Sequence, residues 1–169
     1  MIAVWLCMMQ GDECLKQLGA YVLLIELKDK FEGHVGRLGD ITLPVGVYCY
    51  FGSARGLGGM AARIKHYIFS DKKPHWYVDR VTLTGRVIGF LAVLNGHECD
   101  LREKAIAQKS LVVPVMGFGS SDCLRCPAHL LGIPSGGSAL LGKLSKTVGG
   151  KIYSAAALLP TTTAQPSIV

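Results

Sequence analysis

Three short apolar runs dominate the pattern of hydrophobic and polar positions along the chain. They cover residues 19–27, 47–53 and 86–94, and each run predicts a buried strand because it is short and rich in β-branched or aromatic residues. Residues 34–43 carry glycines at positions 36 and 39 and predict a small hairpin between the first two runs. Strands this close in sequence normally pair antiparallel, so we expect an antiparallel arrangement.

Helices are expected between and after these strands. Residues 59–69 place apolar side chains on one side at a spacing of 3.6 residues, and residues 98–109 begin with acids in the first turn. A shorter helix is expected after Pro74. The predicted fold class is therefore α/β of the α+β type, with a small, mainly antiparallel sheet flanked by helices.

The two sides of the second predicted strand differ in character. Because side chains alternate along a strand, Tyr48, Tyr50 and Gly52 share one face, while Cys49 and Phe51 share the other. We expect the tyrosine face to be polar at its rim and the opposite face to lie in the core.

Length and composition set the domain organisation. The 169 residues suggest a single domain, and half of them are apolar, which is enough for a sizeable core. Residues 1–18 are interpreted as a leader, residues 19–131 as the domain, and residues 132–169 as a weakly structured tail, because the last segment has no acid and one aromatic residue.

The chain is expected to be soluble and cytoplasmic, with no membrane association. No apolar run reaches the roughly 18 residues that a membrane helix needs. Residues 1–9 are apolar, but no basic residue precedes them and no small-residue cleavage site follows, so they do not match a secretory signal.

The formal net charge of +6 is unevenly spread, because residues 55–73 contain five Lys or Arg and one acid. Such a segment suits a polyanionic partner, since neutralising phosphates releases counterions. A solvated helix face is the alternative explanation. The candidate nucleic-acid-binding residues are Ser53, Arg55, Lys65, Lys72, Lys73 and His75.

Three sequence features together resemble the GIY-YIG nuclease superfamily. They are the tripeptide 19–21 (GAY), the stretch 50–54 (YFGSA) and Arg63 on the following helix. The resemblance is closer to its Uri-like branch, the domain family DUF123, and is carried by six stretches in order between residues 19 and 131. These stretches are GAYVLLIEL, VGRLGDITLP, GVYCYFGSA, HWYVD, HECDL and GFGSSDCLRCPAHL.

This resemblance implies metal-dependent hydrolysis of nucleic-acid phosphodiester bonds, with DNA favoured over RNA and Mg²⁺ or Mn²⁺ as cofactor. The candidate catalytic residues are Tyr21, Tyr50, Arg63, His66 and Glu98. The alternatives are a non-catalytic nucleic-acid-binding module of the same fold and a zinc-stabilised interaction domain.

Each candidate residue type suits a part of this chemistry. Tyr21 can relay a proton from water if a nearby cation lowers its pKa from the ordinary value of about 10, and Tyr50 can position the phosphate or the water. Arg63 offers a forked guanidinium to two phosphate oxygens, and His66 can act as a relay. Glu98 is the expected protein ligand of the metal ion, with carboxylates at positions 100 and 103 as rivals.

Ordinary structural roles compete with these assignments. Tyr21 and Tyr50 can be core tyrosines of two strands, and Arg63 can be a surface arginine. Glu98 can be a helix N-terminal acid that the helix dipole favours.

A second candidate metal site is formed by cysteine and histidine. Cys123, Cys126 and His129 have metal-ligand spacing, and Cys99 can supply a fourth ligand to a structural Zn²⁺. The alternative is a set of buried thiols with His129 capping a loop. The resembling branch usually has a Cys-x-Cys spacing here, whereas this chain has Cys-x-x-Cys.

Overall fold

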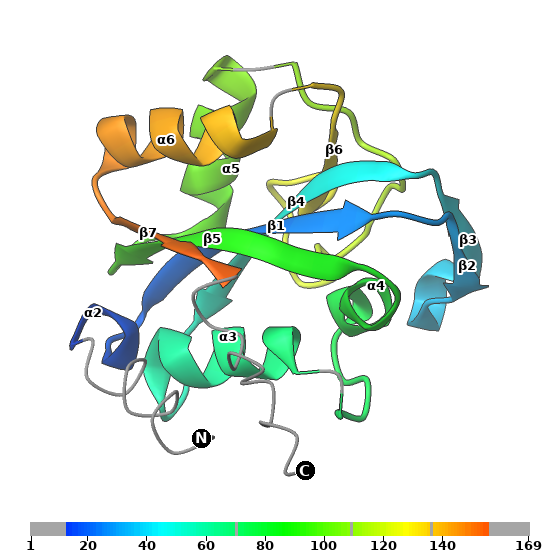
Figure 1. Cartoon of the computed structure of the whole chain (residues 1–169), viewed down its shortest axis with the longest axis horizontal. Coiled ribbons are helices and arrows are strands. Elements are labelled where there is room, and N and C mark those ends of the chain that lie inside the picture. Colours follow the sequence, from blue (N-terminus) through cyan, green and yellow to red (C-terminus); the bar gives the residue numbers. More distant parts are fainter. Residues whose placement is uncertain (1–12, 70, 109, 136, 156–169) are drawn as a thin grey trace, which may run out of the picture.

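The computed structural model describes residues 13–69, 71–108, 110–135 and 137–155. Its centre is a five-stranded sheet in the order β6-β4-β1-β5-β7, in which all neighbouring strands are antiparallel (Figure 1). The strands are β1 (Gly19–Leu27), β4 (Gly46–Ala54), β5 (Arg86–Leu94), β6 (Leu130–Ile133) and β7 (Lys151–Ser154). The predicted α+β class with a mainly antiparallel sheet is confirmed.

The predicted hairpin forms a small separate sheet at one end of the main sheet (Figure 1). It consists of β2 (Phe31–His34) and β3 (Asp40–Leu43), which pair antiparallel across the short 3-10 helix η1 (Gly36–Leu38). Gly36 and Gly39 have positive φ angles of 47° and 73°, which glycine adopts without steric cost.

Helices cover both faces of the five-stranded sheet (Figure 1). On one face lie α2 (Glu13–Lys16), α3 (Gly59–Ile68) and α4 (Tyr77–Thr84), and on the other lie α5 (Glu98–Gln108) and α6 (Gly137–Val148). The central strands β1, β4 and β5 are largely buried on both sides for this reason, which explains their nearly continuous apolar sequences. The edge strand β7 is mostly exposed. Among the described residues, no helix is long and apolar enough to cross a membrane.

The predicted alternation along β4 is correct, but the predicted polar rim is wrong. Tyr48 and Tyr50 pack with α3 and α4 in one core, and Cys49 and Phe51 pack with α5 and α6 in the other. Tyr48 is 5% exposed and Tyr50 is 8% exposed. The tyrosine face is therefore a second core because a helical layer that the strand pattern does not reveal covers it.

The expectation of a weakly structured tail is wrong for residues 132–135 and 137–155. Helix α6 buries Leu140, Leu141 and Leu144 against the sheet, and β7 pairs with β5 at the sheet edge. These three leucines have helical spacing, which the many small residues around them obscured. Of the predicted leader, residues 13–16 form α2, whose Leu15 is buried, and residues 1–12 lie outside the described residues.

Candidate functional site

The candidate site lies at the outer edge of β4, where strand pairing stops. Strand β6 pairs with β4 from Val47 to Tyr50, and the next amide, Phe51 N–H, donates to the carbonyl of His129 at 3.0 Å. Beyond Phe51, no strand of the described chain covers this edge. A cavity of about 180 Å³, the tyrosine pocket, opens there. It is lined by Tyr21, Tyr50, Phe51, Gly52, Ser53, Arg63, Glu98, Gly119, Asp122, Cys123 and His129.

The two tyrosines reach this pocket from neighbouring strands. Tyr21 on β1 is the register partner of Gly52 on β4. A Cβ atom at position 52 would overlap the phenol of Tyr21, so the glycine leaves the space that this ring fills. The hydroxyls of Tyr21 and Tyr67 are hydrogen-bonded at 2.9 Å, and Tyr67 comes from α3. The ring of Tyr67 also lies edge-on to Tyr50, with centroids 6.4 Å apart.

Burial keeps these three phenols neutral. Burial is the largest effect and raises the pKa of Tyr21 well above its ordinary value, and the neighbouring Tyr67 and Tyr50 raise it further. Burial also raises the pKa values of Tyr50 and Tyr67. The Arg63 guanidinium acts in the lowering direction on all three but does not outweigh burial. Arg63 therefore does not bring the pKa of Tyr21 below its ordinary value, and lowering by a metal ion, the other cation expected to act on Tyr21, stays a prediction.

A cation and a carboxylate enter the pocket from opposite faces of the sheet. Arg63 comes from α3, and Glu98 comes from the first turn of α5. The Ser53 hydroxyl donates a hydrogen bond to the Glu98 carboxylate. Partial burial raises the pKa of Glu98, but the hydrogen bond from Ser53 and the nearby His97 outweigh burial and lower it overall. Glu98 is thus an anion at neutral pH.

The rival carboxylates of α5 lie elsewhere. Asp100 and Glu103 accept hydrogen bonds from Arg125 at 3.0 and 2.8 Å, and all three are exposed. Neither acid lines the tyrosine pocket. Of the three acids considered as metal ligands, the structure brings Glu98 to the pocket.

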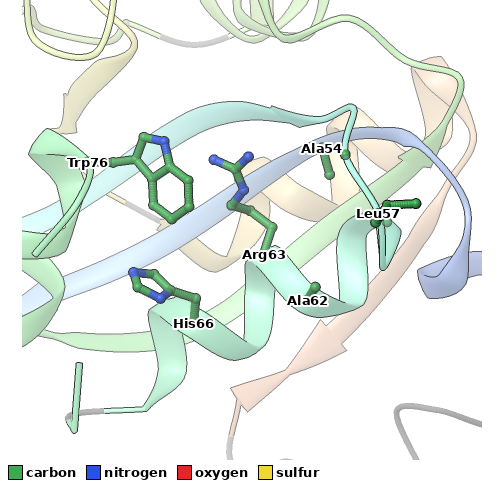
Figure 2. Close-up of a pocket in the computed structure, with 8 residues that line it drawn as sticks. Ala54, Leu57, Ala62, Arg63, His66 and Trp76 are labelled. Atoms are coloured by element: carbon green, nitrogen blue, oxygen red, sulfur yellow. The ribbon is translucent and has the colours of Figure 1, made fainter. Parts of the chain in front are cut away.

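His66 lines a second cavity, the tryptophan pocket, of about 250 Å³. Figure 2 shows Arg63 and His66 extending from the same side of α3 toward Trp76. The Arg63 guanidinium lies 3.8 Å from the centre of the Trp76 ring, and the His66 ring meets that ring edge-on at 5.0 Å. The other lining residues are Ala54, Gly56, Leu57, Gly59 and Ala62. Arg63 lines both pockets, whereas His66 does not line the tyrosine pocket.

A buried acid fixes the wall of the tryptophan pocket. Asp79 is fully buried, and its Oδ2 accepts the backbone N–H of His75 at 2.7 Å and of Trp76 at 2.8 Å. This carboxylate therefore caps the start of α4. His66 Nε2 lies 3.0 Å from the same oxygen. The position of His66 is thus explained by an ion pair or polar contact with Asp79.

The predicted nucleic-acid-binding residues differ in their exposure to solvent. Arg55, Lys65, Lys73 and His75 are exposed around α3, although Arg55 also donates to the Gly96 carbonyl at 3.0 Å. Ser53 is half-buried and lies in the tyrosine pocket.

Lys72 occupies an internal position instead. Its ammonium donates to the Tyr67 carbonyl at 3.0 Å and to the Thr82 hydroxyl at 2.7 Å. Burial lowers the pKa of Lys72, partly offset by Asp79. Lys72 thus joins the end of α3 to α4, and its ammonium is not presented to a ligand in this arrangement.

The cysteine cluster consists of Cys99, Cys123, Cys126 and His129, and one ligand atom from each lies within 4.8 Å of the others. The Cys99 and Cys123 sulfurs are 3.3 Å apart, and Cys99 Sγ lies 3.8 Å from His129 Nε2. These four residues could hold a metal ion, as their spacing in the sequence predicts. Ligand atoms of His97, Glu98 and Cys99 also lie within 4.8 Å of one another.

Tyr67 and His97 are site residues that the sequence reasoning missed. Tyr67 is four residues after Arg63 on α3, so the two share a helix face, and this spacing could have identified it. His97 directly precedes Glu98, and its Nδ1 lies 3.6 Å from the Glu98 carboxylate. No periodicity marks His97, because it precedes the first residue of the helix.

Residues 20–148 match the family model described as "Domain of unknown function DUF123". No curated protein and no solved structure matches the chain. The matched range contains the tyrosine pocket, the tryptophan pocket and the cysteine cluster.

Proposed function

The chain belongs to the DUF123 family, and we propose that it is a metal-dependent endonuclease that hydrolyses nucleic-acid phosphodiester bonds. The observation that carries this proposal is the convergence of Tyr21, Tyr50, Arg63 and Glu98 on one pocket, from two neighbouring strands and from one helix on each side of the sheet. These residues lie far apart in the sequence. The resemblance of their motifs to GIY-YIG nucleases supports the same conclusion, with DNA favoured over RNA.

Glu98 is the residue that would hold the catalytic metal ion. Its carboxylate is anionic at neutral pH and half-buried at the pocket, and hard cations such as Mg²⁺ or Mn²⁺ prefer oxygen ligands. The cavity of about 180 Å³ has room for the water molecules that complete such a site. A metal ion bound there would supply Lewis-acid charge to the phosphate and acidify a bound water.

The remaining pocket residues can position the phosphodiester and stabilise its charge. Arg63 presents a permanent cation to the pocket, and a guanidinium can donate to two phosphate oxygens at once. Tyr21 and Tyr50 are neutral hydroxyls, so they can donate to a phosphate oxygen or orient a water. Tyr67 fixes the Tyr21 hydroxyl through its hydrogen bond and is a positioning residue.

The surface around α3 suits a polyanion. The exposed side chains of Arg55, Lys65 and Lys73 surround the helix that carries Arg63. Their charges would attract the phosphate backbone without reading the sequence of bases. This supports a structure-directed or weakly selective nuclease.

The donor sets of the tyrosine pocket and the cysteine cluster favour different metals. The oxygen ligand Glu98 favours Mg²⁺ or Mn²⁺, whereas the three thiols and one imidazole of the cysteine cluster favour the softer Zn²⁺. We assign the hard ion at Glu98 to catalysis.

Nucleic-acid binding without turnover is the second candidate function. It is favoured by the neutral, buried state of Tyr21 and Tyr50, which therefore supply no protein base in the pocket. Under this alternative, the exposed basic residues would still bind, and the affinity would fall steeply with salt.

The test is cleavage of single-stranded, duplex and branched DNA and of RNA by the full chain with Mg²⁺ or Mn²⁺. Arg63→Ala and Glu98→Gln are each expected to lower the cleavage rate by about 100-fold or more. The first removes a cation that would stabilise the reacting phosphate, and the second removes the anionic oxygen ligand that would hold the metal ion. Arg80→Ala and Glu32→Gln remove an exposed arginine and an exposed glutamate elsewhere and should leave the rate unchanged. Cleavage that survives both pocket substitutions would overturn the assigned roles. Salt-sensitive binding with no cleavage under either metal would support the second candidate.

A further inference from the structure

A long irregular segment packs against the start of α5. The described residues 110–129 contain no helix and no strand apart from an isolated bridge of Val112 with Gly132. Phe118 and Ala128 of this segment are nevertheless fully buried. Long loops without secondary structure are uncommon in compact domains, because ordering them costs conformational entropy. Backbone hydrogen bonds such as Gly117 N–H to the Pro127 carbonyl, at 2.7 Å, and His129 N–H to the Phe118 carbonyl, at 2.8 Å, hold part of this segment. A bound metal ion would add to them.

The cysteine cluster lies where this segment meets α5. Cys99 is the second residue of α5, and Cys123, Cys126 and His129 come from the end of the segment. We propose that these four side chains bind one Zn²⁺, which acts as a structural centre and fastens residues 117–129 to the start of α5.

The four ligand atoms are close enough together for one zinc ion. With Zn–S bonds of about 2.3 Å and Zn–N bonds of about 2.0 Å, two sulfurs of a tetrahedral site are separated by roughly 3.8 Å, and a sulfur and a nitrogen by roughly 3.5 Å. The Cys99 and Cys123 sulfurs are 3.3 Å apart, and Cys99 Sγ lies 3.8 Å from His129 Nε2, so small side-chain shifts would give these separations. All four ligand atoms lie within 4.8 Å of one another.

The surroundings suit a closed site rather than an open one. Cys99, Cys126 and His129 are buried, and Cys123 is half-buried. Three thiolates around one Zn²⁺ leave a net charge of −1, and the buried Arg102 lies close enough to act on Cys126 electrostatically.

The overlapping group of His97, Glu98 and Cys99 is a poorer zinc site. It offers one thiol, and His97 is exposed. A closed set with three thiols retains Zn²⁺ better than an open mixed set, because thiolates are the stronger zinc ligands. Glu98 then stays available to the tyrosine pocket.

The centre would support one wall of the tyrosine pocket. Cys99 directly follows Glu98, and Cys123 and His129 line the same cavity as Glu98. Arg102 Nε donates to the Ala128 carbonyl at 2.7 Å and forms a second link between α5 and the segment. Loss of the metal is therefore expected to loosen both the segment and the first turn of α5. This consequence holds whether or not the protein cleaves nucleic acid.

The first experiment measures metal content in the full chain, purified under reducing conditions without added zinc. We expect about one Zn²⁺ per chain by elemental analysis. Replacement by Co²⁺ should give the charge-transfer absorption of thiolate–cobalt bonds. Cys123→Ser should lower zinc retention at least tenfold, while Cys49→Ala, which removes a buried cysteine outside the cluster, should retain full zinc. His129→Cys should keep the metal and change the cobalt spectrum.

The second experiment measures amide hydrogen exchange before and after zinc is removed with a chelator. Exchange is expected to rise in residues 97–101 and 117–129 and to stay unchanged in the β1–β4 pairing. Sub-stoichiometric zinc in the wild-type chain, or a Cys99–Cys123 disulfide in freshly purified reduced protein, would overturn the proposal. Full zinc in Cys123→Ser would overturn the ligand set. Zinc without cleavage would leave this proposal intact and count against the nuclease.

Discussion

The tyrosine pocket and the tryptophan pocket share Arg63, yet they are built in opposite ways. The tyrosine pocket gathers side chains from β1, β4, α3, α5 and the segment before β6. The tryptophan pocket takes all but one of its lining residues from positions 54–66. In the first pocket, the anionic Glu98 and neutral phenols surround a cavity. In the second, the polar groups of His66 and Asp79 face each other.

This difference suggests that the tyrosine pocket serves the proposed reaction and that the tryptophan pocket stabilises the fold. A polar cavity assembled from distant segments is costly to maintain unless it binds something, because its groups give up hydration on burial. In the tryptophan pocket, one oxygen of the Asp79 carboxylate already accepts two backbone N–H groups at the start of α4 and lies 3.0 Å from His66 Nε2, so this oxygen supports the fold. We therefore expect substitutions at the tyrosine pocket to change cleavage, and those at the tryptophan pocket to change stability.

The largest loss of stability is expected from Asp79→Ala. The substitution leaves the backbone N–H groups of His75 and Trp76 without their acceptor and removes the cap of α4. The free energy of unfolding should fall by about 2–4 kcal/mol. Urea unfolding would measure this, with the exposed Asp29→Ala as a control expected to lie within about 0.5 kcal/mol of wild type. A folded Asp79→Ala protein that has lost cleavage below its melting temperature would place Asp79 in the chemistry.

A pair of glycines, one in each pocket, gives a matched comparison of packing. Gly52→Ala places a methyl group into the buried phenol of Tyr21, whereas Gly56→Ala meets no atom within 4 Å. Gly52→Ala should cost about 1–3 kcal/mol by overpacking, and Gly56→Ala should lie within about 0.5 kcal/mol of wild type. Thermal unfolding of both variants measures the difference. Equal melting temperatures would show that the Tyr21 ring is not held where the structure has it.

The sequence predicted the three central strands well, because β1, β4 and β5 are largely buried on both faces and read as nearly unbroken apolar runs. It did not predict the short edge strands β6 and β7. It failed for α6, whose leucines lie among glycine and serine, and for the polar rim of β4. Helices α3 and α4 bury that face of β4. The alternation of side chains along one strand does not reveal which helices pack on it, so the burial could not be predicted.

The sequence brought Tyr21, Tyr50, Arg63 and Glu98 together through motif resemblance, and the structure places them in one pocket. The sequence did not show that His66 lies outside this pocket. His66 lies three residues after Arg63 on α3, but the contact with Asp79 depends on how α4 packs. The raised pKa of Tyr21 was missed for a related reason, because burial is a property of the whole fold.

A smaller effect is expected from Tyr67→Phe, which removes the partner of the Tyr21 hydroxyl. The free energy of unfolding at pH 8 should fall by about 0.5–1.5 kcal/mol. The pKa of Tyr67 is raised in the folded protein, so its contribution is complete below the unfolded value of about 10 and is lost as the pH rises further. The difference from wild type should therefore shrink between about pH 9.5 and 11. Urea unfolding across this range measures it, and a constant difference would show that Tyr67 ionises as readily as in the unfolded chain.

The smallest effect is expected from His66→Gln, because glutamine can place an amide nitrogen near the position of Nε2 and retain a donor toward Asp79. Since His66 lines the tryptophan pocket and not the tyrosine pocket, the cleavage rate should change by less than about threefold, which corresponds to under roughly 0.7 kcal/mol of barrier. Single-turnover cleavage measured beside Arg63→Ala makes the comparison direct, as both residues lie on α3. A loss in His66→Gln as large as that in Arg63→Ala, with the fold intact, would mean that the two pockets act as one site.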